Sequence, residues 1–259
     1  MLPAPLRLLR PGDWIKNAFV VVPLIFYTAG TRMEGAPLSL GQMFVATLLT
    51  VVAFCLAGSG FYCVNDALDF AEDRLHPVKR RRPVASGAIA QRTAAIMGVL
   101  LVAAGMLVAW KVSPGVQLTV TAYVLLQIAY NVKLKRVRFI DVATVASGFV
   151  LRSIAGAMAI QAAVSIWLVV VVFALTLYLG FVKRLADIRA AQLARDRGEG
   201  TSWKPRAGYD SVEDLNWLLS VTGSITVLAY LMYALSDHAR LLFQARAFGF
   251  ALLMPLVLV

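Results

Sequence analysis

Apolar residues along this chain gather in long blocks that polar residues separate, rather than in the short periods of a soluble domain. Blocks of about 16–25 residues recur, and a helix of that length can cross the roughly 30 Å hydrocarbon core of a bilayer. The pattern predicts eight helices, at 14–30, 40–64, 88–110, 115–132, 138–160, 164–190, 212–235 and 244–259. We therefore expect one all-α, polytopic transmembrane bundle that occupies residues 1–259 as a single domain.

Composition and charge support a membrane protein and argue against a nucleic-acid-binding one. The chain is 60% hydrophobic and carries a net charge of +11. Its Lys and Arg residues concentrate near the N-terminus and around 65–87, 133–138 and 185–211, which is the positive-inside pattern of a polytopic protein. This places the N-terminus and the stretch 61–87 on the cytoplasmic side of a bacterial-type inner membrane. The topology explains most of the net positive charge, so a nucleic-acid partner is not needed to explain it.

The stretch after the second expected helix turns from acidic to basic within a few residues. Asn65 opens it, Asp66, Asp69 and Asp73 lie on one stripe if that helix continues, and the Lys79–Arg82 cluster follows. Mg²⁺ favours a few carboxylate oxygens completed by water and substrate phosphates, and arginine binds phosphate in a bidentate fashion. The pattern thus predicts a site for a metal–diphosphate. The simpler interpretation is a hydrated helix end with nearby counter-charges.

Several further polar residues lie at the cytoplasmic ends of the expected helices or within them. Arg152 falls inside the helix expected at 138–160, and a charge at that depth is by default a functional-site hypothesis. The simpler interpretation is a structural arginine that backbone carbonyls, or Asp141 through water, satisfy. The other candidates are Lys16, Asn17, Tyr130 and Lys135, which could line a donor pocket or be plain interfacial residues.

The motif Asn-Asp-x-x-Asp-x-x-x-Asp at 65–73, with its basic continuation, resembles the first acidic motif of the UbiA-type intramembrane prenyltransferase superfamily. Three further stretches resemble one branch of it, the decaprenyl-phosphate phosphoribosyltransferases: Arg10 to Asn17, Leu134 to Gly156, and Lys183-Arg184-x-x-Asp187. The resemblance covers nearly the whole chain. The family usually has nine helices, with a lateral, lipid-facing cavity and a polar cytoplasmic mouth, whereas eight are expected here.

The resemblance implies a Mg²⁺-dependent transfer of 5-phosphoribose from phosphoribosyl diphosphate to a polyprenyl phosphate of the decaprenyl type, a cell wall precursor step. It implies that Asp66, Asp69 and Asp73 hold the metal and serve catalysis. The implied substrate-binding residues are Lys16, Asn17, Asn65, Lys79, Arg80, Arg82, Tyr130, Lys135, Arg152, Lys183, Arg184 and Asp187. An oligomeric state is not implied.

Lys183 separates the alternative functions. Aromatic prenyltransferases of the superfamily carry a second acidic motif whose first acid matches Lys183 and whose second matches Asp187. A cation in the first position disfavours a prenyl diphosphate donor, although a Lys183–Asp187 helix-surface ion pair would also explain it. Transfer of a prenyl group to an aromatic or other acceptor remains the first alternative. A transporter of anionic metabolites remains the second, because Arg152 would also suit a transport path.

Overall fold

The computed structural model describes residues 3–30, 37–75, 79–196, 209 and 211–236, and within them every regular element is helical. The α-helices are α1 (Ala4–Leu9), α2 (Ala18–Gly30), α3 (Leu40–Leu68), α4 (Phe70–Leu75), α5 (Gln91–Val112), α6 (Pro114–Val132), α7 (Ile140–Ala159), α8 (Ile166–Asp196) and α9 (Val212–Leu235). Three 3₁₀ segments, η1 (Pro11–Asn17), η2 (Lys79–Arg81) and η3 (Leu134–Arg136), join them.

The all-α bundle expected from the hydrophobic pattern is confirmed, with differences at the ends of individual helices. The first expected helix, 14–30, is 3₁₀ through Asn17 and α-helical only from Ala18. The second runs four residues further than expected, to Leu68, and the sixth continues to Asp196. The expected helix at 244–259 lies outside the described residues.

Five of the described helices are long and apolar enough to cross a bilayer: α3, α5, α7, α8 and α9. α2 has only 13 residues, against the roughly 20 that a span needs, so it reaches across only part of the hydrocarbon layer. Large apolar side chains such as Phe44, Val99, Leu107 and Leu228 are more than half exposed on the bundle surface. Lipid is the environment that suits such a surface, and the chain is an integral membrane protein.

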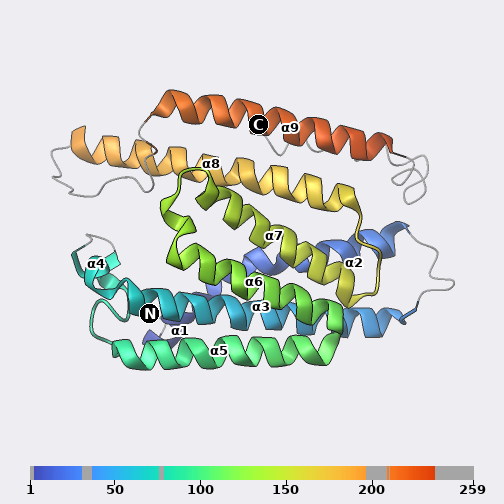
Figure 1. Cartoon of the computed structure of the whole chain (residues 1–259), viewed down its shortest axis with the longest axis horizontal. Coiled ribbons are helices and arrows are strands. Elements are labelled where there is room, and N and C mark those ends of the chain that lie inside the picture. Colours follow the sequence, from blue (N-terminus) through green and yellow to red (C-terminus); the bar gives the residue numbers. More distant parts are fainter. Residues whose placement is uncertain (1–2, 31–36, 76–78, 197–208, 210, 237–259) are drawn as a thin grey trace.

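Two helix pairs flank a central helix (Figure 1). α3 lies along α5 on one side, α8 lies along α9 on the other, and α7 runs between them in contact with α2, α6 and α8. The C-terminal ends of α3 and α8 lie at the same end of the molecule as α4 (left in Figure 1). The acidic motif and the Lys183–Asp187 segment, over a hundred residues apart in the chain, therefore share one end of the bundle.

Small residues allow the helices to approach closely. A Cβ on Gly60 would lie 2.6 Å from the Gly98 carbonyl oxygen, and one on Gly156 would lie 2.0 Å from the Val20 carbonyl oxygen. These glycines bring the α3 and α5 backbones, and the α2 and α7 backbones, into direct contact, as small residues commonly do between membrane helices. The largest buried core packs around Phe54 and Tyr123.

Candidate active site

The acidic motif spans the junction between α3 and α4. α3 ends at Leu68, and the backbone N–H of Asp69 donates to the Asn65 carbonyl over 2.8 Å. The Asp73 N–H donates in turn to the Asp69 carbonyl over 2.8 Å, so the chain keeps its helical path through a brief break. The stripe expected from a continuous helix is preserved well enough for Asp66 and Asp73 to meet the same basic residue.

Arg82 joins these two buried carboxylates. Its Nη1 lies 3.2 Å from Asp66 Oδ1 and 2.7 Å from Asp73 Oδ2, and both acids are at most 2% exposed. Arg10 donates to the same Asp66 oxygen over 2.6 Å, and the Lys79 amine lies 3.9 Å from Asp73 Oδ1. The basic residues that follow the motif therefore compensate its charge directly. Sequence reasoning did not place Arg10 in the site.

Asp69 belongs to a different contact. Its Oδ1 lies 3.2 Å from the Lys135 amine, which η3 supplies. Among the described residues, no three acid, histidine or cysteine side chains stand close enough together to hold a metal. However, Asp66 Oδ2 is buried without a hydrogen-bond partner. Mg²⁺ commonly takes one or two carboxylates and completes its shell with water and substrate phosphates. The carboxylates of the acidic motif therefore fit an ion that arrives with a phosphate substrate.

A polar cavity of about 260 Å³ lies between α3, α6, α7 and α8. It brings together six of the residues predicted for the site: Lys16, Asn65, Tyr130, Arg152, Lys183 and Arg184. Four of these are cations, and no Asp or Glu is among the lining residues. Asp13 pairs with Lys16, and Asp141 and Asp187 pair with Arg184, whereas Arg152 and Lys183 have no carboxylate partner among the described residues. Low-dielectric walls strengthen the field of these two cations, so the cavity is suited to an anion.

Arg152 is the most buried of the four cations, and the three groups that accept its hydrogen bonds are all uncharged. Its Nε donates to Asn17 Oδ1 over 2.8 Å, its Nη1 to the Gly148 carbonyl over 2.9 Å, and its Nη2 to the Tyr123 hydroxyl over 3.1 Å. The predicted carbonyl contact is confirmed, but Asp141 binds elsewhere. A buried cation with no carboxylate partner is costly unless an anion joins it. Asn17 thus reaches the site through Arg152.

The N-terminal segment crosses α3 and brings Lys16 to the cavity. The Lys16 amine donates to the Tyr62 hydroxyl over 3.2 Å and pairs with Asp13, and the Arg10 guanidinium stacks 4.7 Å from the centroid of the Tyr62 ring. Burial lowers the pKa of Lys16, but Tyr62 and Asp13 raise it by more, so the amine remains charged. Trp14 donates to Ser59 over 3.0 Å, which fastens the segment to α3.

On α8 the partners differ from those expected. Arg184 lies 2.8 Å from buried Asp141 and 3.5 Å from Asp187, so the Lys183–Asp187 pair that the spacing allowed is replaced by one between Arg184 and Asp187. The Tyr209 hydroxyl donates to Asp141 Oδ1 over 2.8 Å, and burial together with this bond raises the pKa of Tyr209 above its usual value. Lys183 has no ion pair within the described part of the chain.

The lining of the polar cavity differs from the sequence predictions in two ways. Arg80 is exposed in η2 and does not line the cavity. Sequence reasoning missed Tyr62, Tyr123 and Gln127, which line the cavity. The available signal was a set of hydrogen-bonding side chains within otherwise apolar helices.

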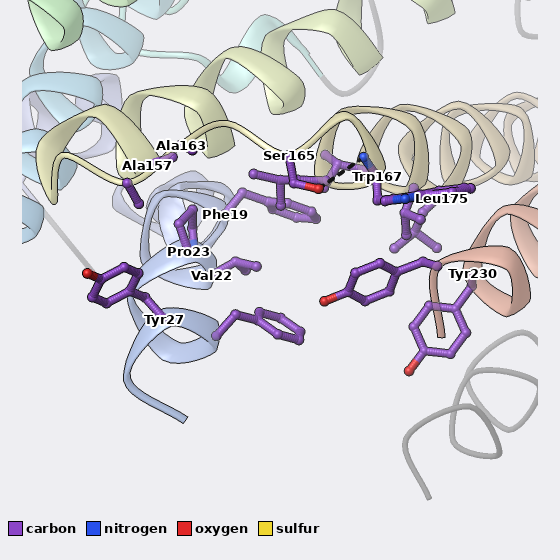
Figure 2. Close-up of a pocket in the computed structure, with 16 residues that line it drawn as sticks. Phe19, Val22, Pro23, Tyr27, Ala157, Ala163, Ser165, Trp167, Leu175 and Tyr230 are labelled. Carbon is purple, nitrogen blue, oxygen red and sulfur yellow. Dashed lines mark hydrogen bonds between the residues drawn. The ribbon is translucent and has the colours of Figure 1, made fainter. Parts of the chain in front are cut away.

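A second, apolar cavity of about 420 Å³ lies towards the opposite end of the bundle, between α2, α8 and α9 (Figure 2). Phe19, Val22, Pro23 and Tyr27 from α2 form one side, and Tyr230 from α9 forms another. Its lining carries no charged residue. An uncharged cavity within a membrane bundle is suited to a hydrocarbon chain.

Known proteins resemble this chain in sequence and in fold. The model of the UbiA prenyltransferase family matches residues 20–202. The chain is 30% identical to a decaprenyl-phosphate phosphoribosyltransferase of Mycolicibacterium smegmatis over 89% of this chain and 70% of that protein. It is 32% identical to the Corynebacterium glutamicum protein of the same name, over 90% and 68%. A UbiA homolog from Archaeoglobus fulgidus, solved with DMAPP and Mg²⁺, superposes with a TM-score of 0.72 at 20% identity, covering 97% of this chain and 87% of that one.

Proposed function

Because this chain belongs to the UbiA prenyltransferase family, we propose that it is a transferase that moves 5-phosphoribose from phosphoribosyl diphosphate to a polyprenyl phosphate. The observation that carries the proposal is the polar cavity, which is lined by Lys16, Arg152, Lys183 and Arg184 and by no acid. Both substrates are phosphate esters, and their combined charge requires more cations than a single phosphate would. The relatives named for this reaction support the same donor and acceptor.

The cavity cations would hold the reacting phosphates in place. The sugar–diphosphate bond at C1 breaks with its electron pair leaving on the diphosphate, and a lipid phosphate oxygen forms the new bond to C1. This oxygen is already anionic at neutral pH, so the step needs no general base. Catalysis then rests on positioning and on cations aimed at the charge that develops on the leaving group. Lys183 and Arg184, which line the same cavity as Asn65 of the acidic motif, would meet that charge.

A divalent metal is the second part of the proposal. Asp66, Asp69 and Asp73 are the residues that would hold Mg²⁺, and the ion would neutralise part of the diphosphate charge. Arg82 now occupies the space between Asp66 and Asp73, so it would have to turn its guanidinium towards the incoming phosphate. Solved relatives of the same fold carry Mg²⁺ or Cd²⁺.

The two cavities would bind different parts of the lipid acceptor. The acceptor phosphate would sit with Arg152 in the polar cavity, and its hydrocarbon chain would extend into the apolar cavity. The distribution of Lys and Arg supports a cytoplasmic N-terminus, so the soluble donor would enter from the cytoplasm. The lipid would reach its site from within the membrane.

The test is transfer by purified protein in lipid nanodiscs, with labelled phosphoribosyl diphosphate, decaprenyl phosphate and Mg²⁺. We expect label in the lipid fraction that depends on both decaprenyl phosphate and Mg²⁺. Parallel reactions with a labelled prenyl diphosphate and an aromatic acceptor examine the alternative donor. Absence of lipid-linked ribose from well-folded protein, or faster use of the prenyl diphosphate, would contradict the proposal.

A further inference from the structure

A pair of aromatic rings connects the lining of the polar cavity with that of the apolar cavity. Phe149 on α7 lines the polar cavity and Phe19 on α2 lines the apolar one. Their ring centroids are 5.0 Å apart, at an interplanar angle of 67°, which is the favoured edge-to-face arrangement. The two cavities share no lining residue, so this contact joins one lining to the other.

Two contacts hold the α2 backbone behind Phe19 against α7. Asn17 on the α2 side binds Arg152 of α7 over 2.8 Å. One turn further along α7, Gly156 packs directly against the Val20 carbonyl, where even a Cβ would lie 2.0 Å away. Because these contacts hold α2 against α7 on either side of Phe19, a passage between the cavities can change its width mainly through rotation of the two rings.

Phe149 also borders the place where an anion would bind. The Arg152 guanidinium carbon lies 5.4 Å from the centroid of the Phe149 ring. A phosphate that Arg152 binds would therefore have the first apolar groups of its ester beside Phe149, with Phe19 next in line. Both rings are only partly buried, which leaves faces available to a hydrocarbon chain.

We propose that Phe19 and Phe149 form the constriction that the chain of the lipid acceptor crosses, and that their size sets the preference for long-chain over short-chain acceptors. This inference rests on the proposed function, because it takes a polyprenyl phosphate as the occupant. A long chain must pass the pair to fill the apolar cavity. A chain that ends before the rings gains nothing from the passage.

The test compares decaprenyl phosphate with geranyl phosphate, which has two isoprene units, in detergent-purified and nanodisc-embedded protein. Phe19→Trp and Phe149→Trp add bulk at the pair, and Phe19→Leu and Phe149→Leu remove the ring while keeping the site apolar. We expect each Trp variant to lower the decaprenyl-to-geranyl ratio of kcat/KM about tenfold, a typical effect of overfilling a packed site. The Leu variants should keep or raise that ratio.

Phe44→Trp is the matched control, since Phe44 is 60% exposed on α3 and lines neither cavity. Thermal unfolding of each variant checks the fold. A ratio within twofold of the wild type in both Trp variants, or an equal loss with both acceptors, would overturn the inference. If the wild type transfers ribose to neither acceptor, the proposed function fails. The inference is then decided by native mass spectrometry without donor, which measures the ratio of the binding affinities for decaprenyl phosphate and geranyl phosphate in each variant.

Discussion

The polar and apolar cavities share two helices, α7 and α8. α8 supplies Lys183 and Arg184 to the polar cavity and, two to four turns earlier, Leu168 and Leu175 to the apolar one. α7 likewise gives Gly148 and Arg152 to the first and Ala157 to the second. The chemistry therefore changes along each helix rather than between domains, and a substrate with a charged head and an apolar tail can lie parallel to the helices.

The largest effect should come from the acids beside the polar cavity. Asp69→Asn and Asp73→Asn are expected to lower kcat by about 10²–10³-fold, because each removes a carboxylate from the proposed metal site while the neutral amide keeps its volume. Mn²⁺ binding, followed by electron paramagnetic resonance, should weaken in parallel. Glu72→Gln, at an exposed acid in the same short helix, should change neither. Near-normal rates in either aspartate variant would remove that residue from the site.

Removal of the deep cation should rank second. Arg152→Met deletes the buried charge proposed to hold the lipid phosphate, and loss of such a charged contact costs about 2–3 kcal/mol, or roughly 30–150-fold in kcat/KM for the acceptor. The measurement is acceptor kinetics at saturating donor, with a melting curve beside it. Arg92→Gln, at an exposed arginine that is the second residue of α5, serves as the control. If only the melting temperature falls, Arg152 is structural.

Lys183 should give a smaller, donor-specific effect. Lys183→Met removes an exposed cavity cation that has no ion pair among the described residues, so folding should be unaffected while kcat/KM for phosphoribosyl diphosphate falls about tenfold. Arg189→Gln, at an exposed residue less than two turns further along α8, should leave it unchanged. An unchanged donor kcat/KM in the Lys183 variant would show that this cation takes no part in donor binding.

Away from Phe19, the apolar cavity should respond most weakly. Leu175→Trp fills part of it, and we expect KM for decaprenyl phosphate to rise about three- to fivefold, with the donor KM unchanged, since only the chain's contacts are disturbed. Leu179→Trp, one turn along the same helix at a half-exposed residue outside the lining, is the control. A change in donor KM would contradict the division between the two cavities.

The sequence predicted the bundle well because long apolar blocks have few structural solutions in a membrane. It placed Arg152 within a helix and Asn65, Lys183 and Arg184 at one site, and all four line the same cavity. It could not identify pairings across the bundle. Arg184 pairs with Asp187 within α8 and also with Asp141, and the second pair depends on how α7 and α8 pack.

The acidic motif illustrates the same limit. The spacing of Asp66, Asp69 and Asp73 predicted one stripe, but the helix breaks at Asp69, which turns to Lys135 while its neighbours share Arg82. The contact between Phe19 and Phe149 had no sequence signal, because phenylalanine is ordinary in an apolar helix. Only the packing of α2 on α7 brings these rings together.

The N-terminal segment has a consequence for the order of assembly during synthesis. Arg10 leaves the ribosome early, yet its partner Asp66 lies 56 residues later, and Arg82, which shares that carboxylate, follows later still. Arg7 likewise donates to the Arg81 carbonyl. The first residues of the chain must therefore wait at the membrane surface until α3 and the segment after α4 have been made. Asp66 and Asp73 would acquire their final contacts only at that point of translation, well before α7 and α8 complete the cavity beside them, whereas Asp69 must wait for Lys135.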